Sequence, residues 1–210
     1  MLDLIKFELT NKKTFKIMSR GLLIFAVVAV VLGMYGCNSY NGLVGQDVNV
    51  QNAWANVQTQ YQRRADLIPN LVSTVKGAAD FEKSTLSAVI EARSKATSVT
   101  LKADQLTPEN IQKFQAAQDQ LSGTLSRLMA VSENYPTLKA TDSFRDLQAQ
   151  LEGTENRITV ARNDFNGTVK GYNLSVRSFP ANIFAGIFGF AQKGFFEASQ
   201  ASQSAPAVKF

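Results

Sequence analysis

An uncharged apolar run of seventeen residues, Gly21–Cys37 (GLLIFAVVAVVLGMYGC), constrains this chain more than any other feature. Folded as a helix it would rise about 25 Å, slightly less than the ~30 Å hydrocarbon core of a bilayer. The preceding residues, 1–20, contain five Lys or Arg and two Asp or Glu, and such a basic excess stays on the cytoplasmic side of a membrane. We therefore expect a basic leader over 1–20, a hydrophobic signal or anchor segment over 21–37, and a body outside the cytoplasm.

The fate of this run depends on Cys37, the single cysteine of the chain. Met34-Tyr35-Gly36-Cys37 resembles a bacterial lipoprotein box, and the stretch from Met18 has the layout of a signal peptide. In this interpretation Cys37 carries the lipid. In the alternative, the helix is not cleaved, crosses the membrane and leaves Cys37 at its outer end. The sequence leaves both open, together with the choice of Met1 or Met18 as the start, and either way the body is tethered.

The positive charge of the chain does not indicate nucleic-acid binding. The formal net charge is +5, and residues 1–20 contribute five minus two, or +3, so the remainder carries about +2. A basic excess confined to a leader directs membrane topology rather than phosphate binding. We therefore expect no nucleic-acid partner.

Beyond the anchor, the apolar residues repeat with a helical period. A polar stretch with two glycines, 38–47, is expected to be a hinge, and apolar residues then recur at spacings of three and four from Val50 to Val75. Pro69 within that pattern predicts a kink or a restart of the helix. A shorter helix is expected around 86–96 and a loop over 97–107. A third helix begins at Thr107-Pro108, where Thr is a good N-cap and Pro suits the first helical position.

The lengths of the helices limit their arrangement. The third carries an apolar stripe at heptad-like spacing from Ile111 to Tyr135 and ends near Pro136. The fourth begins at about 142 and runs for nearly forty residues to Pro180, with a stripe from Phe144 to Phe179. Moderate connections between long helices favour antiparallel neighbours. We therefore predict an all-α fold, an N-terminal membrane anchor followed by an elongated antiparallel up-and-down four-helix bundle over 48–180, whose last helix ends on the membrane side.

The residues after the bundle form a Phe-rich C-terminal segment, 181–198, and a flexible tail, 199–210. Two interpretations stay open for the Phe-rich residues: they close the end of the core, or they contact lipid headgroups or a neighbouring subunit. Glycines inside the fourth helix each cost about 1 kcal/mol relative to Ala and favour the close approach of another helix. The interface candidates are Phe179, Phe184, Phe188, Phe190, Phe195 and Phe196, with Gly153, Gly167 and Gly171.

Several long blocks of this sequence are similar to those of a known protein family. The clearest are QYQRRADLIPNLV (60–72), SENYPTLKA (132–140) and LEGTENRITVARNDFN (151–166), and with shorter blocks between them they span nearly everything after residue 40. On these blocks the chain resembles the LemA family of bacterial envelope proteins. The resemblance implies an N-terminal membrane anchor and a four-helix bundle in the cell envelope. It also implies that no catalytic residue carries over, because the family has no established biochemical activity.

The same blocks contain most of the polar candidates of the body. Arg63 and Asp66 are three residues apart and Asp66 and Asn70 four apart, so each pair shares a helix face. We interpret the set as a partly buried ion and amide network that fixes helix register; the alternative is an exposed patch that binds a partner. The candidates are Arg63, Arg64, Asp66, Asn70, Glu152, Glu155, Asn156, Arg157 and Arg162.

No combination of residues in this chain indicates catalysis. Glu152 and Glu155 could imitate half of a carboxylate metal site, but helical bundles complete such sites with histidine, and the chain has none. A nucleophilic serine would also lack its usual base, and neither a G-x-S-x-G elbow nor a phosphate-binding G-x-x-x-x-G-K loop occurs. We therefore expect no catalytic, cofactor-binding or metal-ligating residue.

These expectations together predict a non-enzymatic scaffold or assembly protein of the bacterial envelope. It would be held on membrane lipid by its N-terminal segment and would form homo-oligomers, with a further envelope protein as a possible partner. The alternative is an adaptor or accessory subunit of a membrane protease, a transporter or an envelope enzyme.

Overall fold

The computed structural model describes residues 2–77 and 81–197, and of residues 2–20 it describes only the backbone. Four long helices account for most of it: α1 (Leu2–Lys76), α2 (Lys83–Ser98), α3 (Pro108–Ser132) and α5 (Asp142–Arg177). Three short elements join them or follow them: η1 (Ala103–Gln105), α4 (Pro136–Lys139) and α6 (Ala181–Phe188). No strand occurs among the described residues, so the prediction of an all-α chain is confirmed.

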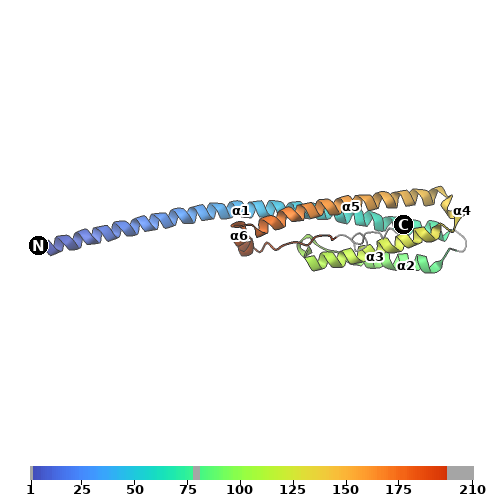
Figure 1. Ribbon diagram of the computed structural model, residues 1–210, viewed down its shortest axis with the longest axis horizontal. Coiled ribbons are helices and arrows are strands. Elements are labelled where there is room, and N and C mark those ends of the chain that lie inside the picture. Colours follow the sequence, from blue (N-terminus) through green and yellow to red (C-terminus); the bar gives the residue numbers. More distant parts are fainter. Residues whose placement is uncertain (1, 78–80, 198–210) are drawn as a thin grey trace, which may run out of the picture.

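The long helices run alternately in opposite directions, as Figure 1 shows. The C-terminal half of α1 packs mainly against α5, and α2 packs mainly against α3. The N-terminal half of α1 projects alone from the packed helices, and α6 lies at the point where the projection begins (Figure 1). The end of α5 and the projecting half of α1 are therefore at the same end of the molecule, as the parity of four passes predicts.

The helix α1 continues without a break from the apolar run into the packed helices. Residues 38–47, expected to be a hinge, are helical, so the prediction of a break there is wrong. The reason is that Leu43 is buried and extends the apolar stripe of Val50 and Trp54 two turns further back. Burial of a leucine side chain stabilises by about 1.5–3 kcal/mol, which offsets the helix-propensity cost of the nearby glycines.

Two clusters of buried side chains form the core. The cluster near the projecting half of α1 is aromatic, with Trp54, Phe114, Phe165 and Phe196 in mutual ring contact. The distal cluster is mostly aliphatic, built around residues such as Leu71, Leu121 and Leu128. The predicted stripes of the third and fourth helices are mostly buried: Tyr135 and Leu147 are half-buried, and Phe179 is 81% exposed. The heptad-like spacing therefore identified the core faces of α3 and α5 correctly.

The start of α3 follows the predicted cap. The Thr107 hydroxyl accepts a hydrogen bond of 3.3 Å from the Asn110 backbone N–H, and Pro108 occupies the first helical position. One N–H at the helix start is thereby satisfied, and the proline removes another that would need a partner.

A side chain from α2 explains why α1 continues through Pro69. Proline has no N–H, so the carbonyl of Ala65, four residues earlier, loses its helical donor. Arg93 of α2 supplies one instead, since its Nε donates to the Ala65 oxygen at 2.8 Å. Ala65 is buried, so an unmet carbonyl there would be costly. The helix therefore does not restart at Pro69, and the bond from Arg93 to the freed Ala65 carbonyl holds α2 against α1.

The contact between Arg93 and the Ala65 carbonyl gives a double-mutant test. We expect Arg93→Ala to lower the free energy of unfolding by about 1–3 kcal/mol, because a buried carbonyl is left without a donor. In a Pro69→Ala background the restored N–H can bond the same carbonyl, so the cost of Arg93→Ala should fall below about 1 kcal/mol. Urea unfolding of the detergent-solubilised chain, followed by the fluorescence of the single tryptophan Trp54, measures both values.

The matched control is Arg63→Ala. Arg63 is exposed and makes no hydrogen bond or ion pair with another described residue, so the change should stay within about 0.5 kcal/mol. An equal cost of Arg93→Ala with and without Pro69 would contradict the explanation.

Candidate functional site

Arg64 is the charged side chain at the centre of the packed helices. It is 2% exposed and lies on α1 between the two core clusters. Its Nη1 donates to Ser122 Oγ at 2.6 Å and to Glu155 Oε2 at 2.9 Å, and its Nη2 donates to Gln118 Oε1 at 2.7 Å. Arg64 therefore joins α1, α3 and α5 through one guanidinium, and a fixed planar fork suits such a junction.

The remaining contacts of Arg64 extend this junction to α2. Gln118, also buried, donates from Nε2 to the carbonyl of Ala96 at 3.1 Å. The guanidinium lies 5.1 Å from the centroid of the Tyr61 ring, within the range of a cation–π contact. Burial raises the pKa of Tyr61 above its ordinary value of 10.0. All four long helices thus meet at one polar point.

The other predicted network residues do not gather at Arg64. Asp66 accepts a bond of 2.8 Å from Gln62 on the surface of α1, and Glu152 accepts one of 3.1 Å from Gln148 on α5. Asn156 and Arg157 are exposed and make no hydrogen bond or ion pair with another described residue. Of the nine candidates, only Arg64 and Glu155 contact each other directly.

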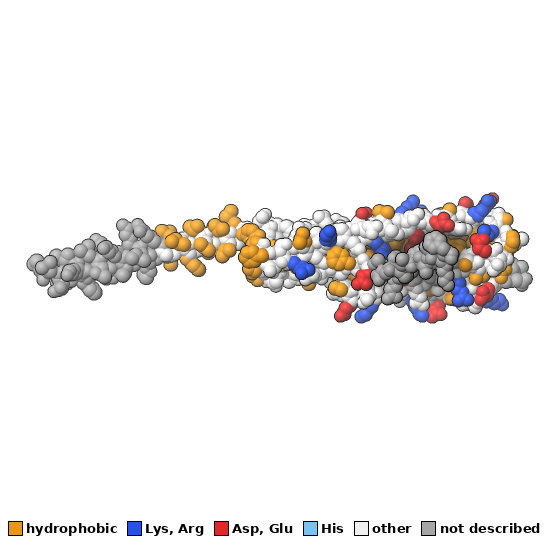
Figure 2. All heavy atoms as spheres, in the orientation of Figure 1, with side chains coloured by type: hydrophobic (Ala, Val, Ile, Leu, Met, Phe, Trp, Pro, Cys, Tyr) orange, Lys and Arg blue, Asp and Glu red, His pale blue; other side chains and the backbone are white. Residues whose placement is uncertain are grey.

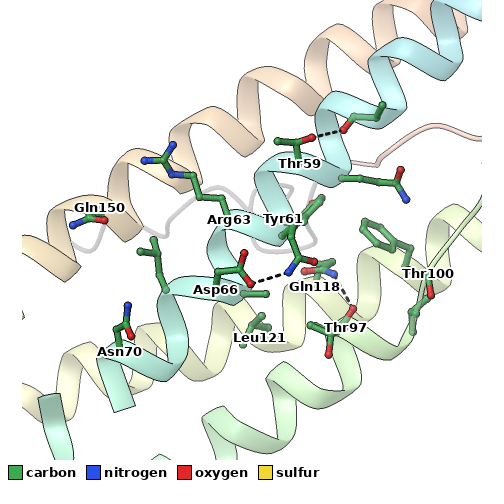
Figure 3. Close-up of a pocket in the computed structure, with 18 residues that line it drawn as sticks. Thr59, Tyr61, Arg63, Asp66, Asn70, Thr97, Thr100, Gln118, Leu121 and Gln150 are labelled. Carbon is green, nitrogen blue, oxygen red and sulfur yellow. Dashed lines mark hydrogen bonds between the residues drawn. The ribbon is translucent and has the colours of Figure 1, made fainter. Parts of the chain in front are cut away.

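An open groove lies beside this junction, between α1 and the C-terminal end of α2 (Figure 3). Its volume is about 930 Å³, and one residue of α5, Gln150, closes one side. The floor is apolar and includes Tyr61, Phe114 and Leu121, and the rim carries amide, hydroxyl and charged groups. The polar rim residues are Gln58, Thr59, Gln62, Arg63, Asp66, Asn70, Thr97, Thr100 and Gln150.

The groove places three of the predicted polar residues on one rim. Arg63, Asp66 and Asn70 come from the outer side of α1, as Figure 3 shows, and Arg63 is directed towards α5. An apolar floor with amides and hydroxyls around it suits an extended chain with many hydrogen-bonding groups. Among the described residues, no three His, Cys, Asp or Glu side chains lie close enough together to hold a metal ion.

The residues after α6 form a second polar feature that the sequence did not indicate. Gly189 adopts a left-handed conformation (φ 78°) at the end of α6, and residues 190–197 then run without helix along α3 and α5. Gly194 passes so close to Pro108 that an added Cβ would lie 2.7 Å from the Pro108 Cα. Glycine is therefore required where this segment crosses the start of α3.

Three amide side chains hold this segment by its backbone, and each bonds both the N–H and the C=O of one residue. Asn173 bonds Lys193 at 2.9 and 2.8 Å, and Asn166 bonds Phe196 at 2.9 and 2.8 Å. Gln115 on α3 bonds Glu197 at 3.0 and 2.9 Å. We name these three pairs the amide clamp. Asn166 and Asn173 are seven residues apart and so project from the same face of α5, a signal visible in the sequence only once the partner segment is known.

Charge and ring contacts complete the attachment of the segment. Lys193 forms an ion pair of 2.7 Å with Asp47 of α1. Tyr172 donates a hydrogen bond of 3.0 Å to the Ala191 carbonyl, and burial raises the pKa of Tyr172 to about 12. The Arg162 guanidinium lies 4.7 Å from the centroid of the Phe196 ring and donates to the Glu197 carbonyl at 3.1 Å. Arg162, predicted for the polar network, therefore serves this segment.

The predicted interface residues divide into buried and exposed sets. Phe196 is 5% exposed and belongs to the core, while Phe184 lies against α1. Phe179, Phe188 and Phe195 are exposed. The glycines of α5, Gly153, Gly167 and Gly171, face open space, because a Cβ added at any of them would meet nothing within 4 Å. No helix of this chain approaches them within the described residues.

The projecting half of α1 presents its apolar side chains to the outside. Within the described residues, α1 is the helix long and apolar enough to cross a membrane. Figure 2 shows these apolar side chains uncovered along the projection. Where the projection meets the packed helices, Phe184 of α6 contacts Gly36, and a Cβ added at Gly36 would lie 2.8 Å from the ring. Cys37, the next residue, is exposed.

Comparison with known proteins identifies a matching family and several relatives. The model of the LemA family matches residues 53–210. Magnetosome protein MamQ 2 of Paramagnetospirillum magneticum is 28% identical over 182 residues, which cover 79% of this chain and 67% of the relative. Magnetosome protein MamQ of Magnetospirillum gryphiswaldense is 26% identical with the same coverage. Protein LemA of Metamycoplasma hominis is 24% identical over 160 residues, 76% of this chain and 69% of that one.

The unequal burial of Arg64 and Glu155 predicts unequal effects of mutation. The Arg64 side chain is buried, whereas the Glu155 side chain is 52% exposed. Because Arg64 is buried, Glu155→Gln leaves a buried cation without its counter-charge. We expect a loss of about 1–2 kcal/mol in the free energy of unfolding, below the full cost of breaking a buried pair because water reaches the carboxylate. In an Arg64→Met background the same change should cost less than about 0.5 kcal/mol. Urea unfolding measures both.

The control for this cycle is Glu152→Gln, an exposed carboxylate one turn away that accepts a bond only from Gln148. Its effect should stay within about 0.5 kcal/mol. The explanation fails if Glu155→Gln is as mild as this control, or if its cost survives the removal of Arg64.

The raised pKa of Tyr172 predicts a loss of stability at high pH. The folded value of about 12 lies above the ordinary value of 10.0, so the unfolded chain loses this proton first as pH rises. The contribution is fully present below pH 10 and declines as pH rises towards 12. We expect Tyr172→Phe to reduce this decline, as measured by urea unfolding at a series of pH values. Tyr61→Phe is the comparison, since it retains the share that Tyr172 contributes. An unchanged decline in Tyr172→Phe would refute the assignment.

Proposed function

This chain belongs to the LemA family, and on that premise we propose that it is a non-enzymatic, membrane-tethered helical scaffold or assembly protein of the bacterial cell envelope. The observation that carries the proposal is the form of α1. One helix supplies both the uncovered apolar projection and one wall of the packed core. A scaffold needs a body held at a fixed height above the membrane, and a continuous helix provides that without a flexible joint.

The contacts of α6 favour an anchor that is kept rather than cleaved. Phe184 packs against Gly36 and lies 5.7 Å, ring centroid to ring centroid, from Tyr35. Tyr35 and Gly36 both precede Cys37, so cleavage before Cys37 would remove the residues of α1 that Phe184 contacts. We therefore propose that α1 remains whole and crosses the membrane, with the packed helices on the extracytoplasmic side as the basic residues of 1–20 indicate.

Self-association is the mechanism that we propose for the scaffold. Gly153, Gly167 and Gly171 leave open space along α5, and exposed glycines inside a helix allow another helix to approach closely. Each glycine also destabilises the helix by about 1 kcal/mol relative to Ala, and no close contact with another described residue offsets this cost. A second copy packed along α5 would account for these glycines.

The chemistry of the polar site supports a structural role. Arg64 is enclosed by Gln118, Ser122 and Glu155, and both of its Nη groups donate hydrogen bonds that join the helices. Such a group fixes the register of the helices, and the side-chain oxygens of Ser122 and Glu155 that accept from the guanidinium take part in this junction. A buried network of this kind supports a rod of constant shape, which a scaffold requires.

The groove beside α1 favours a second candidate, an adaptor for a membrane protease, a transporter or an envelope enzyme. Its volume of about 930 Å³ and its polar rim suit a segment of a partner protein. The two roles differ in what the groove does, because a self-associating scaffold does not need it. Cross-linking from the rim of the groove, for example from a photoreactive residue in place of Asn70, distinguishes them by whether the captured chain is a second copy.

Native mass spectrometry of the full chain from detergent tests the proposal. We expect a subunit mass that matches the uncleaved chain of 23.0 kDa and a species with more than one subunit. Replacing Gly167 and Gly171 with Leu fills the open side of α5 and should shift the population towards the monomer. Gly123→Leu is the control, because Gly123 of α3 also faces open space but lies on another helix.

The outcomes separate the parts of the proposal. A subunit that begins at Cys37 and carries lipid would overturn the uncleaved anchor but leave the scaffold in place. A strictly monomeric wild-type chain would overturn self-association, and turnover of a substrate by the chain's own side chains would overturn the non-enzymatic role.

A further inference from the structure

A small apolar surface lies on the outer side of α6. Phe179 is 81% exposed, Ile183 52%, Ile187 70% and Phe188 47%. Ile183 and Ile187 are four residues apart on one side of α6, and Phe179 lies just before the helix, next to Pro180. We call these four residues the outer α6 face. They are all large and apolar, and each leaves about half or more of its surface exposed.

The position of this face is fixed by the contacts of α6 with α1. Phe184 meets Gly36, and the rings of Tyr40 and Phe188 lie 4.9 Å apart in an edge-on arrangement. Ile183 and Ile187 lie on the flank of α6 beside these contacts and stay exposed, at the level of the last turns of the apolar run. Figure 2 shows apolar side chains extending from the projection onto the near end of the packed helices.

Charge is sparse at this end of the molecule. No charged residue occurs between Gly21 and Gln46 of α1 or between Ser178 and Gln192. The first charge on α1, Asp47, is paired with Lys193, and Arg177 stands immediately before the uncharged C-terminal stretch. An apolar surface next to a basic residue suits the boundary between acyl chains and headgroups, where the apolar groups enter lipid and the charged group stays in water.

We infer that the outer α6 face enters the lipid bilayer at the extracytoplasmic boundary, beside the point where α1 leaves it. This inference rests on the proposed membrane tether and adds a second lipid contact to it. The apolar run rises about 25 Å as a helix, slightly short of a ~30 Å hydrocarbon core. Contact with α6 at its outer end supplies further apolar surface at that depth, and the packed helices are thereby held at a set height and tilt.

Lipid suits this surface better than a second copy. At the observed exposures, four large apolar side chains offer roughly 500 Å², whereas a stable protein interface needs about 800 Å² on each partner. The face is also continuous with the surface of α1 that the proposed tether already places in lipid. A short, uncharged helix beside a membrane helix has the bilayer as its nearest apolar neighbour.

The test uses the full chain in nanodiscs of phosphatidylethanolamine and phosphatidylglycerol with one copy in each disc, so that no second copy can cover the face. In a Cys37→Ser background, Ile187→Cys carries an environment-sensitive NBD fluorophore. We expect a blue-shifted emission and a loss of roughly half its intensity when the discs contain lipid with a doxyl quencher near the headgroup, because an interfacial helix lies about 5–10 Å deep. Val160→Cys is the matched control, an exposed apolar position in the middle of α5.

A third label, on Val28→Cys in the apolar run, separates this inference from the proposed tether. Quenching at 28 and 187 but not at 160 supports the inference. Quenching at 28 alone overturns it and leaves the tether in place. No quenching at 28 overturns the tether itself, and equal quenching at 160 and 187 shows that the whole body lies on the bilayer, which also overturns a contact specific to α6.

Discussion

One stripe of apolar side chains on α1, from Leu43 to Val75, determines how the rest of the chain is arranged. α5 packs along this stripe, α3 contributes rings and aliphatic groups to both core clusters, and α2 is held by the Arg93 bond to the Ala65 carbonyl. The stripe begins within the segment that follows the apolar run. For this reason the core and the projection share one helix, and the position of the packed helices relative to the apolar run follows from the geometry of that helix.

Polar groups in the interior add specificity to this apolar packing. Arg64 meets partners on α3 and α5, and Gln118 continues the contact to α2. Apolar stripes alone allow helices to slide by a turn at modest cost, whereas a buried cation that loses its partners costs several kcal/mol. The amide clamp does the same for residues 190–197, since each amide matches one N–H and one C=O of an extended backbone.

Local periodicity predicted much of this fold, and long-range contacts explain what it did not. The stripes of α3 and α5, the cap at Thr107 and the all-α class follow from spacing and residue type. The expectation of a hinge over 38–47 is wrong. Glycines at 42 and 45 indicate a break in the helix, but the burial of Leu43 stabilises the helix there, and that burial depends on core residues distant in the sequence. Phe196, expected with the other phenylalanines at an interface, is buried because Asn166, thirty residues earlier, holds its backbone. Of the polar candidates, spacing grouped Arg63 with Asp66 on one rim, but only the fold showed that Arg64 contacts Glu155.

The continuity of α1 makes the molecule a lever. From Gly36 to Lys76 the helix rises about 60 Å, so a tilt of about 10° at the membrane would displace the far end by roughly 10 Å. Membrane helices tilt when the hydrocarbon thickness does not match their apolar length. If the apolar run of α1 crosses a bilayer, as proposed, a change in bilayer thickness would therefore move the far end of α1, without any change in the packing of the helices.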